Sequence, residues 1–97
     1  MLERNPTVYI MTNKRTGTLD IGVTSDLIKR VYEHKFLKIK GFTKDNNCTC
    51  LVYYEQHEGM FSAIAREKQI KAGSRKKKLF LIEKLNPEWL DLYESII

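Results

Sequence analysis

The chain has 97 residues, which is enough for one domain, and carries 17 Lys+Arg against 12 Asp+Glu for a formal net charge of +5. Its 42% hydrophobic and 30% charged residues are typical of a soluble globular protein, and no apolar run approaches the roughly 20 residues of a membrane-spanning helix. The first residues lack the apolar core of a secretory signal, so we expect one cytoplasmic domain over residues 1–97 with no membrane contact. Cys48 and Cys50 are too few for a disulfide scaffold and support no zinc site, and we expect both to be packing residues. The excess of cations suits a polyanionic partner such as nucleic acid.

The first half of the chain predicts a hairpin, a helix and a third strand. Residues 7–13 and 18–23 are rich in β-branched and aromatic types, and the residues between them are turn-forming. Apolar residues then recur at helical spacing over about 25–36. The polar segment 37–48 reads as an exposed loop, and residues 49–55 form the third predicted strand.

The second half predicts two helices and a short closing segment. The helices cover about 60–72 and 75–85, separated by Gly73 and Ser74, which are typical of a helix end and a helix start. The expected core residues here are Phe61, Ile64, Ala65, Ile70, Leu79, Phe80, Ile82, Leu85, Trp89 and Leu92. The order ββαβαα favours the α+β class, with a three-stranded antiparallel sheet flanked by helices.

Two short motifs stand at hairpin spacing near the start, Thr7-Val8-Tyr9 and Asp20-Ile21-Gly22. Arg30 and His34 follow four residues apart, so they share one face of the predicted helix. Glu67 lies on the next predicted helix, and Asn86 opens the run 86–89 near the end.

Together these motifs resemble the GIY-YIG nuclease superfamily, and in particular its small stand-alone bacterial members, over about Thr7 to Leu92. In that family the paired motifs read Gly-Ile-Tyr and Tyr-Ile-Gly. Thr7 therefore replaces the first glycine, and Asp20 replaces the second tyrosine. The resemblance implies the fold and a metal-dependent endonuclease activity.

The resemblance also implies a role for each matched residue in phosphodiester hydrolysis, typically of DNA, with one divalent cation, Mg²⁺ or Mn²⁺. Tyr9 matches a tyrosine close to the nucleophile and phosphate, and Arg30 matches an arginine that stabilises phosphate charge. His34 matches a residue near the nucleophile, and Glu67 matches the metal-binding glutamate. Asp20 stands where a tyrosine is proposed to help deprotonate the attacking water, and Asn86 is a looser match to a late asparagine.

The residue types fit these roles, although each also has a purely structural interpretation. A guanidinium matches phosphate oxygens and stays charged, and a lone carboxylate suits Mg²⁺, which keeps most of its waters. Alternatively, Tyr9 is a strand aromatic at the core edge, and Arg30 and His34 are on a solvated helix face with an Asp26–Arg30 ion pair. Glu67 could equally pair with a neighbouring cation on its helix.

Asp20 is the decisive position, because Asp is depleted in strands and breaks a local rule here. One interpretation makes it a general base or a second metal ligand. The other is that loss of the phenol impairs cleavage and leaves a nucleic-acid binder. Because a carboxylate is shorter than a phenol and repels phosphate, we favour impaired catalysis. A chance or engineered substitution is a third alternative.

The run Arg75-Lys76-Lys77-Lys78 opens the predicted third helix, where cations oppose the helix dipole and bring no gain in folding. We therefore predict that these four residues bind nucleic acid, with DNA as the expected partner. A solvated charge run is the alternative. The whole chain is then an endonuclease, a non-catalytic nucleic-acid-binding module or, as a weaker alternative, a protein-interaction module.

Overall fold

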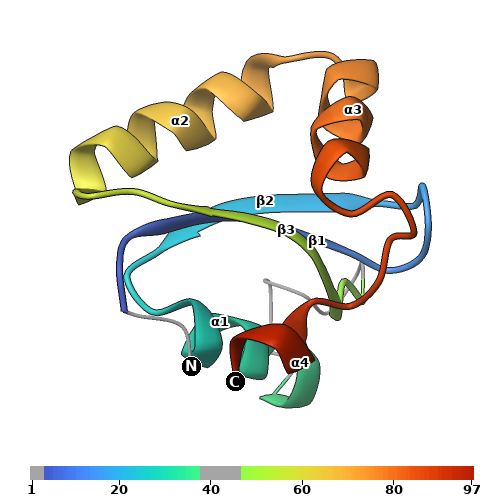
Figure 1. Cartoon of the computed structure of the whole chain (residues 1–97), viewed down its shortest axis with the longest axis horizontal. Coiled ribbons are helices and arrows are strands. Elements are labelled where there is room, and N and C mark those ends of the chain that lie inside the picture. The colour runs from blue at the N-terminus through green and yellow to red at the C-terminus, as the bar shows by residue number, and fades with distance from the viewer. Residues whose placement is uncertain (1–3, 38–46) are drawn as a thin grey trace.

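The computed structural model describes residues 4–37 and 47–97 and contains one antiparallel sheet in the order β2-β1-β3 (Figure 1). The strands are β1 (Thr7–Thr12), β2 (Leu19–Thr24) and β3 (Cys50–Gln56). All six residues of β1 are buried, because this strand lies between the other two and is covered on both faces. The predicted three-stranded sheet and α+β class are confirmed.

The helices are divided between the two faces of the sheet (Figure 1). One face carries α2 (Met60–Ala72) and α3 (Arg75–Leu85), as predicted. The other carries α1 (Leu27–Tyr32), a π-helical turn η1 and the short α4 (Tyr93–Ile96). The turn η1 (Glu33–Leu37) continues α1, so the first predicted helix changes its winding after Tyr32. Most of the predicted loop lies outside the described residues.

The alternation of β1 builds two hydrophobic cores, one on each face. Val8 and Ile10 pack with Ile70 of α2 and Ile82 of α3. Tyr9 and Met11 belong to the opposite core, whose other buried members are Leu27, Val31, Cys48, Leu51 and Ile96. Tyr9, the tyrosine of the first motif, therefore faces α1 and not the long helices.

Five predicted core residues are wrong, because they lie on the outer surface. Phe61 is 90% exposed and Phe80 is 70% exposed. Ile64, Ala65 and Leu85 are also exposed. The α2 helix buries only Ala63 and Ile70 fully, so the rest of its apolar residues have no sheet to cover. Of the other predictions, Ile70, Ile82 and Trp89 are buried, and Leu79 and Leu92 are half-buried.

The two cysteines are free thiols, and Cys48 is buried just before β3 while Cys50 is half-buried within it. Burial raises the pKa of the Cys48 thiol to about 11, so this group stays protonated at neutral pH. Their predicted role as packing residues is confirmed. Among the residues described, none of the helices has the length and apolar content needed to cross a membrane.

Candidate active site

The Tyr9 side chain crosses over Gly22, its partner across the β1–β2 pairing. A Cβ atom placed on Gly22 would lie 2.4 Å from Tyr9 Oη and 2.6 Å from Cζ. Real Cβ atoms do not approach other atoms so closely, so any larger residue here would push the phenol aside. The glycine of the second motif therefore creates the space through which the tyrosine of the first motif passes.

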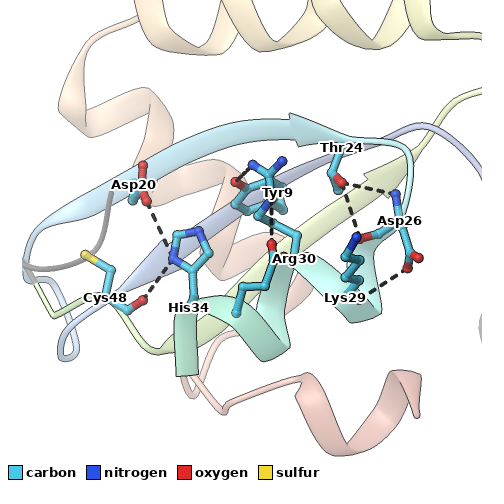
Figure 2. Close-up of polar contacts among 9 residues, drawn as sticks. Tyr9, Asp20, Thr24, Asp26, Lys29, Arg30, His34 and Cys48 are labelled. Atoms are coloured by element: carbon cyan, nitrogen blue, oxygen red, sulfur yellow. Dashed lines mark hydrogen bonds and ion pairs between the residues drawn. The ribbon is translucent and has the colours of Figure 1, made fainter. Parts of the chain in front are cut away.

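Arg30 on α1 reaches the same phenol, and its Nη1 donates a hydrogen bond to Tyr9 Oη over 3.2 Å (Figure 2). Its Nε lies 3.7 Å from the Glu33 carboxylate. Burial raises the pKa of Tyr9 to about 12, and the Arg30 charge opposes this shift. The phenol is consequently neutral at physiological pH and is held in place by a charged donor.

Asp20 lies two residues before Gly22, so it projects from the same face of β2. Figure 2 shows its carboxylate directed at His34, with 3.8 Å between Asp20 Oδ2 and His34 Nδ1. The same Nδ1 lies 3.4 Å from the Cys48 carbonyl oxygen, which can only accept a hydrogen bond. A proton on Nδ1 satisfies both neighbours, and in the neutral ring it leaves Nε2 as the basic nitrogen.

Burial dominates the protonation of this Asp20–His34 pair. It raises the pKa of Asp20, against the lowering effect of His34, Lys71 and Arg30. It lowers the pKa of His34, against the raising effect of Asp20 and the Cys48 carbonyl. Desolvation thus favours the neutral form of each group, and His34 is uncharged at neutral pH.

Glu67 approaches the site from α2, on the opposite face of the sheet. Its charge raises the pKa of Tyr9 slightly, and the charge of its neighbour Lys71 acts on Asp20. Glu67 and Lys71 form an ion pair of 3.1 Å, and the Glu67 side chain is 15% exposed. The α2 helix therefore contributes a carboxylate and an ammonium whose charges influence Tyr9 of β1 and Asp20 of β2.

The site offers a metal ion two candidate carboxylates from the chain, Glu67 and Asp20, of which Asp20 is directed at His34. Within residues 4–37 and 47–97, no group of three or more His, Cys, Asp and Glu side chains is placed to enclose a metal. This arrangement fits Mg²⁺, which binds through one or two carboxylates together with waters and substrate phosphates. It does not fit a closed structural zinc site, which needs four protein ligands.

A polar pocket of about 310 Å³ adjoins Arg30, and sequence reasoning missed it. Its lining includes the cations Arg4, Lys29 and Arg30 and the carboxylates Asp26 and Glu33. Asp26 also caps α1 by accepting a hydrogen bond from the Lys29 backbone N–H over 3.2 Å, and it lies 3.6 Å from Arg4. The signal in the sequence was the charged segment around the start of the helix.

The remaining predicted residues lie away from this cluster and have local contacts of their own. Arg75 Nη2 donates to the backbone oxygens of Thr16 and Gly17 at 2.6 and 2.8 Å, so it ties the hairpin turn to α3. Asn86 is buried, and its amide donates to the oxygens of Val52 and Leu90. This asparagine joins β3 to the closing segment and is a structural residue.

Comparisons with known proteins agree with the motif analysis. The family model described as the GIY-YIG catalytic domain matches residues 5–80. A UPF0213 protein of Staphylococcus saprophyticus is 37% identical over 75 residues, which are 77% of this chain and 90% of the relative. A UPF0213 protein of Staphylococcus aureus is 37% identical over 67 residues, covering 69% and 82%. No solved structure matches the chain. The names of these relatives state no activity, and the predicted resemblance is confirmed.

Proposed function

Because the chain belongs to the GIY-YIG nuclease family, we propose that it is an endonuclease that hydrolyses phosphodiester bonds in DNA with one divalent cation, at a reduced rate. The observation that carries this proposal is the hydrogen bond between Arg30 and Tyr9, together with the electrostatic influence of the Glu67 carboxylate on the Tyr9 phenol. These three residues supply phosphate binding, orientation and a metal ligand without any rearrangement of the fold. The reduction in rate follows from Asp20.

Arg30 binds the scissile phosphate in this proposal. Its guanidinium is always charged and offers several donors, so it can bond Tyr9 and a phosphate oxygen together. The Tyr9 phenol keeps the guanidinium oriented and stands beside the phosphate. Arg4 and Lys29 in the adjoining polar pocket would attract the neighbouring phosphates of the strand.

Glu67 holds the cation, Mg²⁺ or Mn²⁺, in this proposal. Its carboxylate already accepts a cation, the Lys71 ammonium at 3.1 Å, which the metal ion would displace. When bound, the metal would offset the phosphate charge and stabilise the leaving oxygen. Lys71 would then remain close by as a second positive group.

The weak step is deprotonation of the attacking water. Position 20 lacks the tyrosine of the family motif, and the Asp20 carboxylate is directed at His34. His34 is neutral and has a basic nitrogen, yet only 1% of it is exposed, so water reaches it poorly. General-base catalysis contributes about 10²–10⁴-fold, and we expect a loss near the lower end of that range.

Cleavage of labelled duplex, single-stranded and branched DNA with Mg²⁺ or Mn²⁺ tests the proposal. We expect slow cleavage that Glu67→Ala abolishes and that Asp20→Tyr accelerates about 10²-fold. Lys68→Ala is the matched control, because this exposed residue adjoins Glu67 on the same helix. If Asp20→Tyr is no faster than the natural chain, the carboxylate is a competent replacement and the reduced rate is wrong.

A non-catalytic nucleic-acid-binding module is the second candidate function. It is favoured by the two internal contacts, Glu67 with Lys71 and Asp20 with His34, which already engage both carboxylates of the site. In that case none of the variants cuts any substrate, and DNA binding survives Glu67→Ala. Binding should still weaken steeply with salt, because it depends on phosphate contacts.

A further inference from the structure

A groove of about 220 Å³ runs between α2 and α3, and the active site does not use it. We call it the α2–α3 groove. Its lining residues are Arg66, Gln69, Ile70, Gly73, Lys77, Lys78, Phe80 and Leu81. It thus includes two members of the basic run, Lys77 and Lys78, together with an aromatic ring.

The lining of the α2–α3 groove combines apolar side chains with positively charged ones. No lining residue is a carboxylate. The Arg66 charge is compensated from outside the groove, because its Nε donates to Glu55 Oε2 over 3.0 Å. The net positive charge of the groove therefore comes from Lys77 and Lys78. Phe80 is 70% exposed, and a ring so open to water on a folded surface is available for a ligand.

Several contacts hold the Arg66 side chain of the groove lining in place. Glu55 also accepts hydrogen bonds from Tyr53 Oη and, at 2.7 Å, from His57 Nε2, and these contacts help to keep the pKa of Glu55 low. Arg66 Nη1 donates to Gln69 Oε1 over 2.8 Å. A side chain with this many partners does not have to be ordered when a ligand binds, which lowers the entropic cost of binding.

The size and chemistry of the groove favour a nucleotide. At about 220 Å³ it is smaller than the roughly 300–1,000 Å³ of pockets for drug-sized ligands, which suits one small planar group. A single planar base against Phe80, with its phosphates at Lys77 and Lys78, matches both the apolar and the cationic side chains of the lining. Base–aromatic stacking beside a basic track is the usual way to bind single strands.

The groove and the active site lie on opposite flanks of α2. Arg66 is tied to Glu55 of β3, whereas Glu67 acts on Tyr9 beside β2. These two strands are the opposite edges of the sheet. A nucleic-acid strand bound in the groove would therefore lie apart from the phosphodiester bound at Arg30. We propose that the α2–α3 groove binds an unpaired nucleotide of a nucleic-acid substrate that carries a single-stranded segment, an inference that rests on the proposed function.

The test is fluorescence anisotropy of the full chain with a labelled oligothymidylate of about 12 nucleotides, without divalent metal. We expect Phe80→Ala to weaken binding about 5- to 150-fold, the range of base stacking on an aromatic ring. We expect Lys77→Ala with Lys78→Ala to reduce the slope of log affinity against log salt by about 1.4, for two lost phosphate contacts. Lys14→Ala with Lys68→Ala removes the same charge outside the groove and should leave the slope unchanged.

Phe80→Leu keeps an apolar side chain without the aromatic face, so it should bind as weakly as Phe80→Ala. Natural affinity in Phe80→Leu, or equal slopes in the two double-lysine variants, would overturn the proposal. So would an acidic peptide that binds this groove while the oligothymidylate does not, because the partner would then be a protein.

Cleavage of plain duplex DNA, measured in parallel, separates this inference from the proposed function. We expect Phe80→Ala to cut plain duplex at the natural rate, since the ring lies away from Arg30. If the chain cuts duplex DNA and Phe80→Ala binds single strands normally, only the proposal of nucleotide binding in the groove is refuted. If binding depends on Phe80 and no substrate is cut, only the proposed nuclease activity is refuted.

Discussion

Replacing Gly22 by alanine should displace Tyr9 and damage the site without removing any of its polar groups. The new methyl carbon would lie 2.4 Å from Tyr9 Oη and 2.6 Å from Cζ. Ordinary contact between carbon atoms needs about 3.5–4.0 Å, so the ring has to move by roughly 1 Å. The hydrogen bond from Arg30 is already 3.2 Å long and would be stretched or lost.

The expected cost of Gly22→Ala has two opposing parts. Overpacking a buried site costs about 1–3 kcal/mol, and Tyr9 is only 1% exposed, so it has little room to yield. Alanine in a strand gains about 0.5–1 kcal/mol over glycine through backbone entropy. The net loss of stability should therefore be roughly 0.5–2 kcal/mol. Without the Tyr9 ring the same substitution should be neutral or stabilising.

Urea unfolding of Gly22→Ala, Tyr9→Ala and the double variant measures this difference as a coupling free energy. We expect about 1–3 kcal/mol of coupling, equal to the overpacking cost. Gly59→Ala is the matched control, because a Cβ at Gly59 meets no atom within 4 Å. Its coupling with Tyr9→Ala should stay below about 0.5 kcal/mol.

Activity gives a second measurement of the same displacement. Moving a positioning group by about 1 Å can cost about 10²-fold in rate, so we expect Gly22→Ala to lose most of its cleavage activity while folded. The reasoning is refuted if Gly22→Ala costs the same stability with and without the Tyr9 ring. In that case the glycine serves β2 itself and not the phenol.

Two further substitutions test the pH dependence and the closing segment. Because burial raises the pKa of Asp20 in the folded chain above its ordinary 3.8, its ionised form destabilises the fold at neutral pH. Asp20→Asn should therefore raise the free energy of unfolding at pH 7, and urea unfolding should show this gain vanishing below pH 3.8. An equal gain at pH 7 and below pH 3.8 would contradict a raised pKa for Asp20. Asn86→Ala should cost about 1–3 kcal/mol, because the Val52 and Leu90 oxygens lose a donor in the interior. The folded variant should keep its cleavage rate, and a loss of activity at unchanged stability would give Asn86 a role in the site.

The amino-acid sequence determined the order of the elements, the hairpin and the family. These features depend on local patterns, since β-branched runs, turn residues and helical spacing act over a few neighbouring positions. The pairing of the two motifs also follows locally, because a hairpin sets Tyr9 opposite Gly22. Sequence alone could thus indicate the fold and several matched residues.

The environment of each site residue depended on contacts between distant segments. Asp20 meets His34 and the Cys48 carbonyl only after β2, η1 and the start of β3 have packed together. Glu67 acts on Tyr9 because α2 crosses the sheet above β2. Protonation depends on burial and neighbouring charge, which no local pattern records.

The exposed aromatic residues show that burial, too, could not be predicted from local sequence patterns. Helical spacing indicated that Phe61 and Phe80 could be buried, but it could not say how much sheet was available to cover them. A three-stranded sheet leaves α2 and α3 with narrow buried stripes, so Phe61 on α2 and Phe80 on α3 face outward. Sequence therefore determined which residues could form a core, and the tertiary structure decided which of them had a surface to pack against.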